Sequence, residues 1–126
     1  MIQDQQLQRL VDRFYAKVRE DDLIGPVFNS AITDWPEHLR KLGAFWSSVM
    51  NCSGRYKGNP MAAHLRHVKS IEPRMFQRWV DLWRCTAREE LHPADADAVI
   101  AKAERISESL QLGLFFKPEP RRGAPA

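Results

Sequence analysis

Apolar side chains recur every three or four residues through most of the chain, and no segment shows the alternation typical of a half-buried β-strand. The pattern is clearest in residues 5–20, where the apolar positions share one stripe of a helix: Leu7, Leu10, Val11, Phe14, Tyr15 and Val18. It recurs in residues 34–50, in residues 73–91 and from residue 93 to about residue 114. The sequence therefore predicts an all-α fold.

Turn and capping residues divide this pattern into about five helices. The Gly-Pro pair at 25–26 ends the first helix, and residues 27–29 are expected to form a corner with one short helical turn. Asp34 followed by Glu37 resembles a capping box, and the Asn-Pro pair at 59–60 is typical of a helix start. The inner side of the short helix that follows is predicted to carry Met61, His64, Leu65 and Val68.

The length of the chain favours one domain. With 126 residues, it buries roughly two thirds of the surface of the unfolded chain, which is too little for two independent cores. We expect a single domain over residues 1–117. Residues 118–126 are rich in proline and charge and poor in apolar residues, so a disordered tail is expected there.

Charge and cysteine content argue against several classes of protein. The formal net charge is +3, but basic and acidic residues alternate, so no nucleic-acid partner is expected. No basic segment with an apolar run opens the chain, and no apolar run is long enough to span a membrane. We therefore expect a soluble cytoplasmic protein without a membrane partner. Cys52 and Cys85 form no CxxC motif, so free thiols are expected, with a single disulfide as the alternative.

Aromatic residues are numerous enough to form the walls of a sizeable cavity. The chain has four Trp, six Phe and two Tyr. Most fall within the helical stripes or beside them: Phe14, Tyr15, Phe28, Trp35, Phe45, Trp46, Phe76, Trp79 and Trp83.

Two histidines lie within the apolar faces of this aromatic region. His64 has Met61 one turn before it and Val68 one turn after it, so its ring is expected to face apolar surroundings. A neutral imidazole in that position can donate an electron pair to iron. The alternative is a core histidine that is hydrogen-bonded to a carbonyl. His38, within the helix of residues 34–50, has the same two interpretations.

Tyr15 and Trp79 add polar groups to apolar stripes. Tyr15 directly follows Phe14, and a buried hydroxyl needs a partner that phenylalanine would not require. The indole of Trp79 can only donate a hydrogen bond. Helix packing could bring Tyr15, His38 and Trp79 toward one point, with His64 on the other side. The alternative is that all of them are core residues.

Six stretches occur in a specific order along the chain: FYAKVR at 14–19, LIGPVFN at 23–29, WPEHL at 35–39, FW at 45–46, YKGNPMAAH at 56–64 and FQRW at 76–79. Together they resemble the truncated haemoglobins, specifically their third group. The resemblance spans roughly residues 5–114. No Gly-Gly pair occurs, which fits the third group because glycine pairs mark loops of the first.

The resemblance implies a role for each matching residue. His64 would be the proximal ligand of haem iron, Tyr15 and Trp79 would donate hydrogen bonds to the iron-bound ligand, and His38 would gate its entry. Lys41 would reach a haem propionate, for which Arg40 and Tyr56 are weaker candidates. The full set of implied haem contacts is Phe28, Lys41, Leu42, Phe45, Trp46, Tyr56, Met61, Val68 and Phe76.

The resemblance also implies a two-over-two helical sandwich around one haem b, in which residues 5–20 and 34–50 pack against the last two helices. Attachment would be non-covalent because the chain has no CxxCH motif. His67 could compete as a ligand, but it lies about 60° from His64 around a helix, so a surface position is expected. Two histidines are also too few for a structural zinc site.

The function implied is binding of O₂, CO or NO at a five-coordinate ferrous iron. Each hydrogen bond from Tyr15 and Trp79 to a charged acceptor contributes about 1.5–3 kcal/mol, so O₂ release would be slow and bulk transport is disfavoured. Nitric-oxide dioxygenation or peroxide chemistry is expected instead, with Tyr15 and Trp79 as catalytic groups and an external electron donor. The alternatives are a haem-free helical interaction module and a six-coordinate haem redox sensor in which His38 binds iron.

Overall fold

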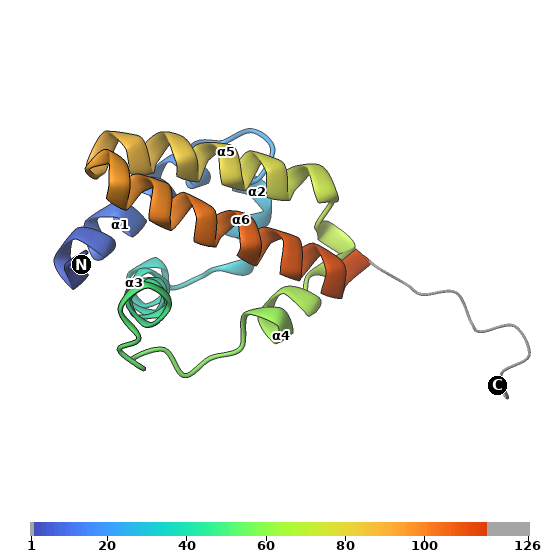
Figure 1. Ribbon diagram of the computed structural model, residues 1–126. Coiled ribbons are helices and arrows are strands. Elements are labelled where there is room, and N and C mark those ends of the chain that lie inside the picture. The colour runs from blue at the N-terminus through green and yellow to red at the C-terminus, as the bar shows by residue number, and fades with distance from the viewer. Residues whose placement is uncertain (1, 116–126) are drawn as a thin grey trace, which may run out of the picture.

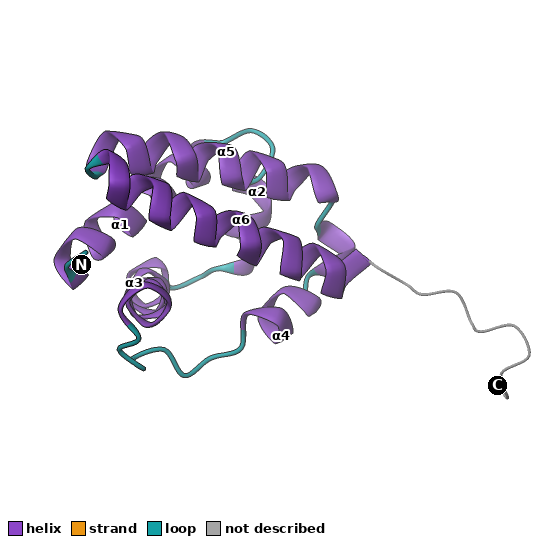
Figure 2. Ribbon diagram, viewed as in Figure 1, coloured by secondary structure: helices purple, strands orange, loops and turns teal. Residues whose placement is uncertain are grey.

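The computed structural model describes residues 2–115, and every regular element in that range is helical (Figures 1 and 2). The elements are α1 (Asp4–Glu20), α2 (Gly25–Ala31), α3 (Trp35–Asn51), α4 (Pro60–Leu65), a 3₁₀ turn (Val68–Ser70), α5 (Pro73–Glu90) and α6 (Pro93–Phe115). The predicted all-α fold is confirmed. The predicted tail at 118–126 lies outside the described residues, as do residues 116–117 of the predicted domain.

The described part contains one more α-helix than the five that the sequence indicated. Residues 25–31 form the seven-residue helix α2, where the sequence predicted only a corner with a single turn. The Asp21 carboxylate accepts the backbone N–H groups of Leu23 and Ile24, both at 3.0 Å, and the Gly25 N–H donates to the Asp21 carbonyl at 2.9 Å. These bonds begin the helical path before Pro26, so the proline lies in the first turn of α2 and does not interrupt it.

The helices form two crossed layers (Figure 1). α5 and α6 lie side by side and run antiparallel, and α1 packs against both α3 and α5. α3 reaches the other layer through Trp46, which stacks on Trp83 of α5 with ring centroids 4.3 Å apart. This is the expected two-over-two arrangement. α4 is set apart from these pairs and packs against α6.

The main core is built on the stripe of α1. All six apolar positions that the sequence placed on that stripe are buried, and five of them have no exposed surface. Trp83 is also fully buried, and its indole N–H donates to the Val99 carbonyl of α6 at 3.2 Å. Burial of each large side chain contributes about 1.5–3 kcal/mol, so α1, α5 and α6 are held together chiefly by this core.

A glycine allows α1 and α3 to approach closely. Gly43 of α3 faces Gln8 of α1, whose side-chain amide donates to the Leu39 carbonyl at 3.1 Å. A Cβ atom at position 43 would overlap that amide. The glycine therefore lets Gln8 hydrogen-bond directly to the backbone of the neighbouring helix.

A second, smaller apolar cluster lies where α4 meets α5 and α6. Phe76, Leu110 and Leu114 are its buried members, and Met61 and Val68 pack against them. Leu65, which the sequence placed on the inner side of α4, is 48% exposed, and that prediction was wrong. Helix α4 is only six residues long and turns Met61 toward α6, which leaves Leu65 at its end facing outward.

Two further sequence expectations concern the thiols and the membrane. Cys52 and Cys85 are both exposed free thiols. Within residues 2–115, no helix combines the length and apolar character that crossing a membrane requires.

Candidate functional site

One large pocket opens between the two layers and α4. Its volume is about 890 Å³, near the upper end of the range typical of cofactor and ligand pockets. Eleven residues that the sequence singled out line it: Tyr15, Phe28, His38, Lys41, Leu42, Phe45, Trp46, Tyr56, His64, Phe76 and Trp79. The structure thus gathers residues from five helices and one loop around a single space.

Two of the implied haem contacts are not brought to this pocket. Met61 and Val68 pack against the smaller apolar cluster, and the terminal methyl of Met61 lies beside Gly113 of α6. They support the segment that carries His64 from behind and do not line the cavity.

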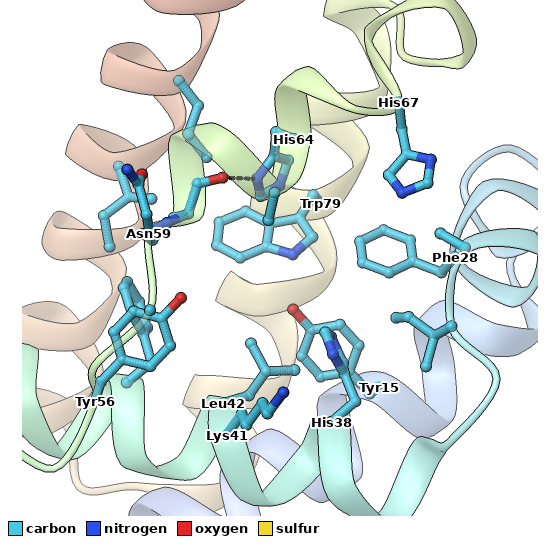
Figure 3. Close-up of a pocket in the computed structure, with 18 of the residues that line it drawn as sticks. Tyr15, Phe28, His38, Lys41, Leu42, Tyr56, Asn59, His64, His67 and Trp79 are labelled. Atoms are coloured by element: carbon cyan, nitrogen blue, oxygen red, sulfur yellow. Dashed lines mark hydrogen bonds between the residues drawn. The ribbon is translucent and has the colours of Figure 1, made fainter.

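His64 is positioned by a short, well-capped helix. The Asn59 side chain accepts the Ala62 N–H at 3.2 Å, and Pro60 occupies the first turn, as the sequence predicted. The Nδ1 atom of His64 lies 2.7 Å from the Pro60 carbonyl oxygen (Figure 3). A carbonyl oxygen can only accept, so Nδ1 carries the proton. In the neutral ring, Nε2 then keeps a free electron pair, which is the form that binds a metal.

Tyr15 projects into the pocket from the opposite side. The residue is only 4% exposed, and its hydroxyl points toward the cavity (Figure 3). Burial raises the pKa of this hydroxyl to about 12, although a hydrogen bond with the Trp79 indole opposes the rise. The hydroxyl therefore stays protonated at neutral pH and is available as a hydrogen-bond donor.

His38 stands beside Tyr15 on the same side. Its ring meets the Tyr15 ring edge-on, with centroids 6.3 Å apart. Burial lowers the pKa of His38, and the charge of Lys41 lowers it further. The imidazole is therefore neutral at pH 7 and faces His64 across the pocket (Figure 3).

Trp79 ends a row of three indoles that begins in the core. Its ring lies 6.0 Å from that of Trp83 at an interplanar angle of 6°, and Trp83 stacks in turn on Trp46. Phe14 meets Trp79 edge-on at 5.6 Å. The position of Trp79 in the pocket wall is thus fixed by the main core.

The cations near the pocket differ in their partners. Arg40 forms two hydrogen bonds with Glu37, at 2.9 and 2.6 Å. Lys41 forms no ion pair with any described residue, and neither do Lys57 and Arg66, which the sequence did not single out. Lys41 is consequently better placed than Arg40 to bind an anionic group of a ligand.

Several lining residues were missed from the sequence. Ile106, Ser107 and Leu110 of α6 border the pocket, although α6 contributed no site residue to the prediction. Periodicity identified the inner face of α6, but it carries no information on which inner residues border a cavity. His67, expected on the surface, is exposed and also lines the rim of the pocket (Figure 3).

Comparisons with known proteins point to a single group. No family model matches the chain. A group 3 truncated haemoglobin of Campylobacter jejuni is 29% identical over 118 residues, which cover 90% of this chain and 92% of that protein. The crystal structure of a group III truncated haemoglobin from Campylobacter jejuni matches with a TM-score of 0.83 and 29% identity, covering 91% of this chain and 93% of that one.

Proposed function

We propose that this chain, which has a globin fold and whose predicted resemblance to the group III truncated haemoglobins is confirmed in both sequence and fold, binds one haem b in the pocket. The iron is held by Nε2 of His64, and attachment is non-covalent. The observation that carries the proposal is the bond between His64 Nδ1 and the Pro60 carbonyl, because it leaves Nε2 unprotonated.

The residues around the pocket fit a flat, mostly apolar cofactor with an anionic edge. Phe28, Leu42, Phe45 and Phe76 supply apolar and aromatic walls. Lys41, which has no ion-pair partner among the described residues, supplies a cation for a carboxylate. Tyr56 lies at the same pocket with its hydroxyl facing the cavity (Figure 3).

Haem, when bound, supplies an iron atom at which O₂, CO or NO can bind. The chain itself supplies the polar groups opposite His64. Tyr15 keeps its proton because its pKa is raised, and Trp79 has an N–H that can only donate. Hydrogen bonds to a ligand that carries partial negative charge contribute about 1.5–3 kcal/mol each, so these two donors slow ligand release.

Slow release suits chemistry or sensing better than oxygen delivery. The reaction that we favour is the oxidation of NO to nitrate by O₂, with peroxide reduction as the second candidate. Turnover also needs an electron donor, and we expect it to be a separate reductant. Tyr15 and Trp79 orient the reacting ligand, and neutral His38 stands beside its path.

Titration of the haem-free protein with haem tests the proposal. We expect one equivalent to give a Soret band, and the ferrous form to have a five-coordinate spectrum. Absence of a Soret band would identify a haem-free interaction module. A six-coordinate ferrous spectrum would make His38 a second ligand and favour a redox sensor. Stopped-flow mixing of the O₂ complex with NO then measures the favoured reaction directly.

A further inference from the structure

The loop between α3 and α4, residues 52–59, forms one side of the pocket. It contains no regular secondary structure, yet five consecutive residues, 55–59, line the cavity. Tyr56 extends from this loop with its hydroxyl toward the cavity (Figure 3). We call this segment the strap. The rate at which a cofactor leaves the pocket on this side should therefore depend on how firmly the strap is held in place.

The strap is bound to the start of α1 through Asp4, the first residue of that helix. One carboxylate oxygen accepts the Ser47 hydroxyl at 2.8 Å, and the other accepts the Arg55 guanidinium at 3.0 Å. The Asn51 amide donates to Asp4 at 3.3 Å and to the Ile2 carbonyl at 2.7 Å. Asp4 thus joins the N-terminus, the end of α3 and the strap.

Two serines of α3 continue the connection. The Ser47 hydroxyl gives its single proton to the Asp4 carboxylate, so at its 2.7 Å contact with Ser53 it must accept. Ser48 accepts the Tyr56 backbone N–H at 2.9 Å and donates to the Ala44 carbonyl at 3.0 Å. Residues 53 and 56 of the strap are therefore both bound to α3.

The side chain of Tyr56 also packs against neighbouring residues. Its ring meets Phe45 edge-on at 5.1 Å. Gly58 lies under the hydroxyl, and a Cβ atom there would collide with it. The glycine therefore allows the tyrosine to fold over the strap and face the pocket.

We propose that Asp4 is a positioning residue for cofactor retention, acting on the strap through Arg55 and Ser47. The inference rests on the proposed haem-binding function and names a residue outside the pocket that controls it. An exposed ion pair alone contributes little. Here the Asp4 carboxylate also accepts from the fully buried Ser47, and hydrogen bonds to a charged acceptor are stronger than neutral ones.

Asp4→Ala tests this inference, with Asp95→Ala as its matched control. Both aspartates lie in the first turn of a helix, but Asp95 has no side-chain partner among the described residues. Arg55→Gln is a second variant, placed in the loop, that breaks the same link without altering α1. The first measurement is the rate of haem loss to excess apomyoglobin. The second is hydrogen exchange of the Tyr56 amide in the haem-free protein.

We expect Asp4→Ala and Arg55→Gln each to accelerate haem loss about three- to tenfold and to speed exchange of the Tyr56 amide, while Asp95→Ala leaves both rates unchanged. The double variant should lose haem no faster than the faster single variant, because both act on one link. Unchanged haem loss in both single variants overturns the inference. Failure of the unmodified protein to bind haem would instead overturn the proposed function.

Discussion

The ligand side of the pocket belongs to the main core, whereas the His64 side stands outside it. Tyr15 and Trp79 project from α1 and α5, and their neighbours Phe14 and Trp83 have no exposed surface. By contrast, neither α4 nor the 3₁₀ turn after it contains a buried residue. The donors are thus fixed by packing, while the candidate iron ligand is fixed by a cap and one carbonyl. Changes on the two sides should therefore affect different properties of the protein.

Loss of the imidazole should have the largest effect on the cofactor and almost none on the fold. In His64→Ala we expect stable haem binding to disappear, because no other residue presents a free ring nitrogen in that position. Helix content should be unchanged, since α4 buries no side chain. Soret absorbance and circular dichroism measure the two properties. His67→Ala is the control and should keep its haem; loss of haem from the control alone would assign the iron to His67.

A substitution in the core should have the opposite signature. Trp83→Ala removes a fully buried ring that joins α3, α5 and α6, so the free energy of unfolding should fall by about 3–5 kcal/mol. Urea denaturation of the haem-free protein measures it. Leu112→Ala, at a residue 64% exposed, should change stability by less than about 0.5 kcal/mol. Similar losses in both variants would mean that the main core is not centred on Trp83.

Removal of a single hydroxyl should change ligand release without loosening haem. Tyr15→Phe keeps the packing of the ring but deletes a hydrogen-bond donor that contributes about 1.5–3 kcal/mol. We expect O₂ to dissociate about ten- to a hundredfold faster, as measured by ligand replacement with CO in a stopped-flow instrument. An unchanged dissociation rate would remove Tyr15 from contact with the ligand.

Two caps with the same geometry allow the two sides to be compared directly. Asn59 caps α4 and Asp34 caps α3, each accepting a backbone N–H at 3.2 Å. Each change to alanine should weaken its helix by about 1 kcal/mol. Only Asn59→Ala should lower haem affinity, because α4 has no buried side chain to compensate. Equal loss of affinity in both variants would contradict the contrast between the two sides. Haem titration and amide exchange in residues 60–65 provide the readout.

The smallest effect on stability is expected from a substitution of Asp21, just before α2, and this effect should depend on pH. Burial alone would raise the pKa of Asp21, but the Ile24 N–H, the Arg78 guanidinium and the Leu23 N–H outweigh it, so the pKa is lowered. The contribution of Asp21 to stability is therefore complete above its unfolded pKa of about 3.9 and is lost as pH falls through its lower folded pKa. Asp21→Asn should destabilise the protein at pH 7 and cease to do so in strong acid.

Exposed Asp22, which has no side-chain partner among the described residues, is the control for that experiment. Urea titrations at several pH values should show a constant, small effect of Asp22→Asn. A constant effect of Asp21→Asn as well would mean that the carboxylate does not act through its charge.

Local sequence signals predicted those features that depend on neighbouring residues. Periodicity identified the buried stripe of α1, and the capping roles of Asp34 and Asn59 followed from side chains that bond within three residues. In each case the signal lies within a single helix, either as the spacing of apolar residues or as a side chain close to the N–H that it caps.

Features that depend on residues far apart in the chain could not be predicted from local sequence patterns. The link from Asp4 to Arg55 joins positions 51 residues apart, and neither residue belongs to a recognisable motif. The outward position of Leu65 follows from the packing of α4 on α6, which the period of a six-residue helix cannot specify. The site residues came largely from the family resemblance, and their roles as ligand, donors and gate stay predictions.

The row of three indoles that joins the core to the wall of the pocket should make tryptophan fluorescence sensitive to what the pocket holds. Trp46, Trp83 and Trp79 are close enough for excitation energy to pass between their rings, and both Trp46 and Trp79 border the cavity. A bound cofactor that absorbs at the emission wavelength of tryptophan would quench this fluorescence by energy transfer. The intensity of tryptophan fluorescence should therefore be high in the cofactor-free protein and low in the cofactor-bound protein. Binding and release of the cofactor can then be followed without a label.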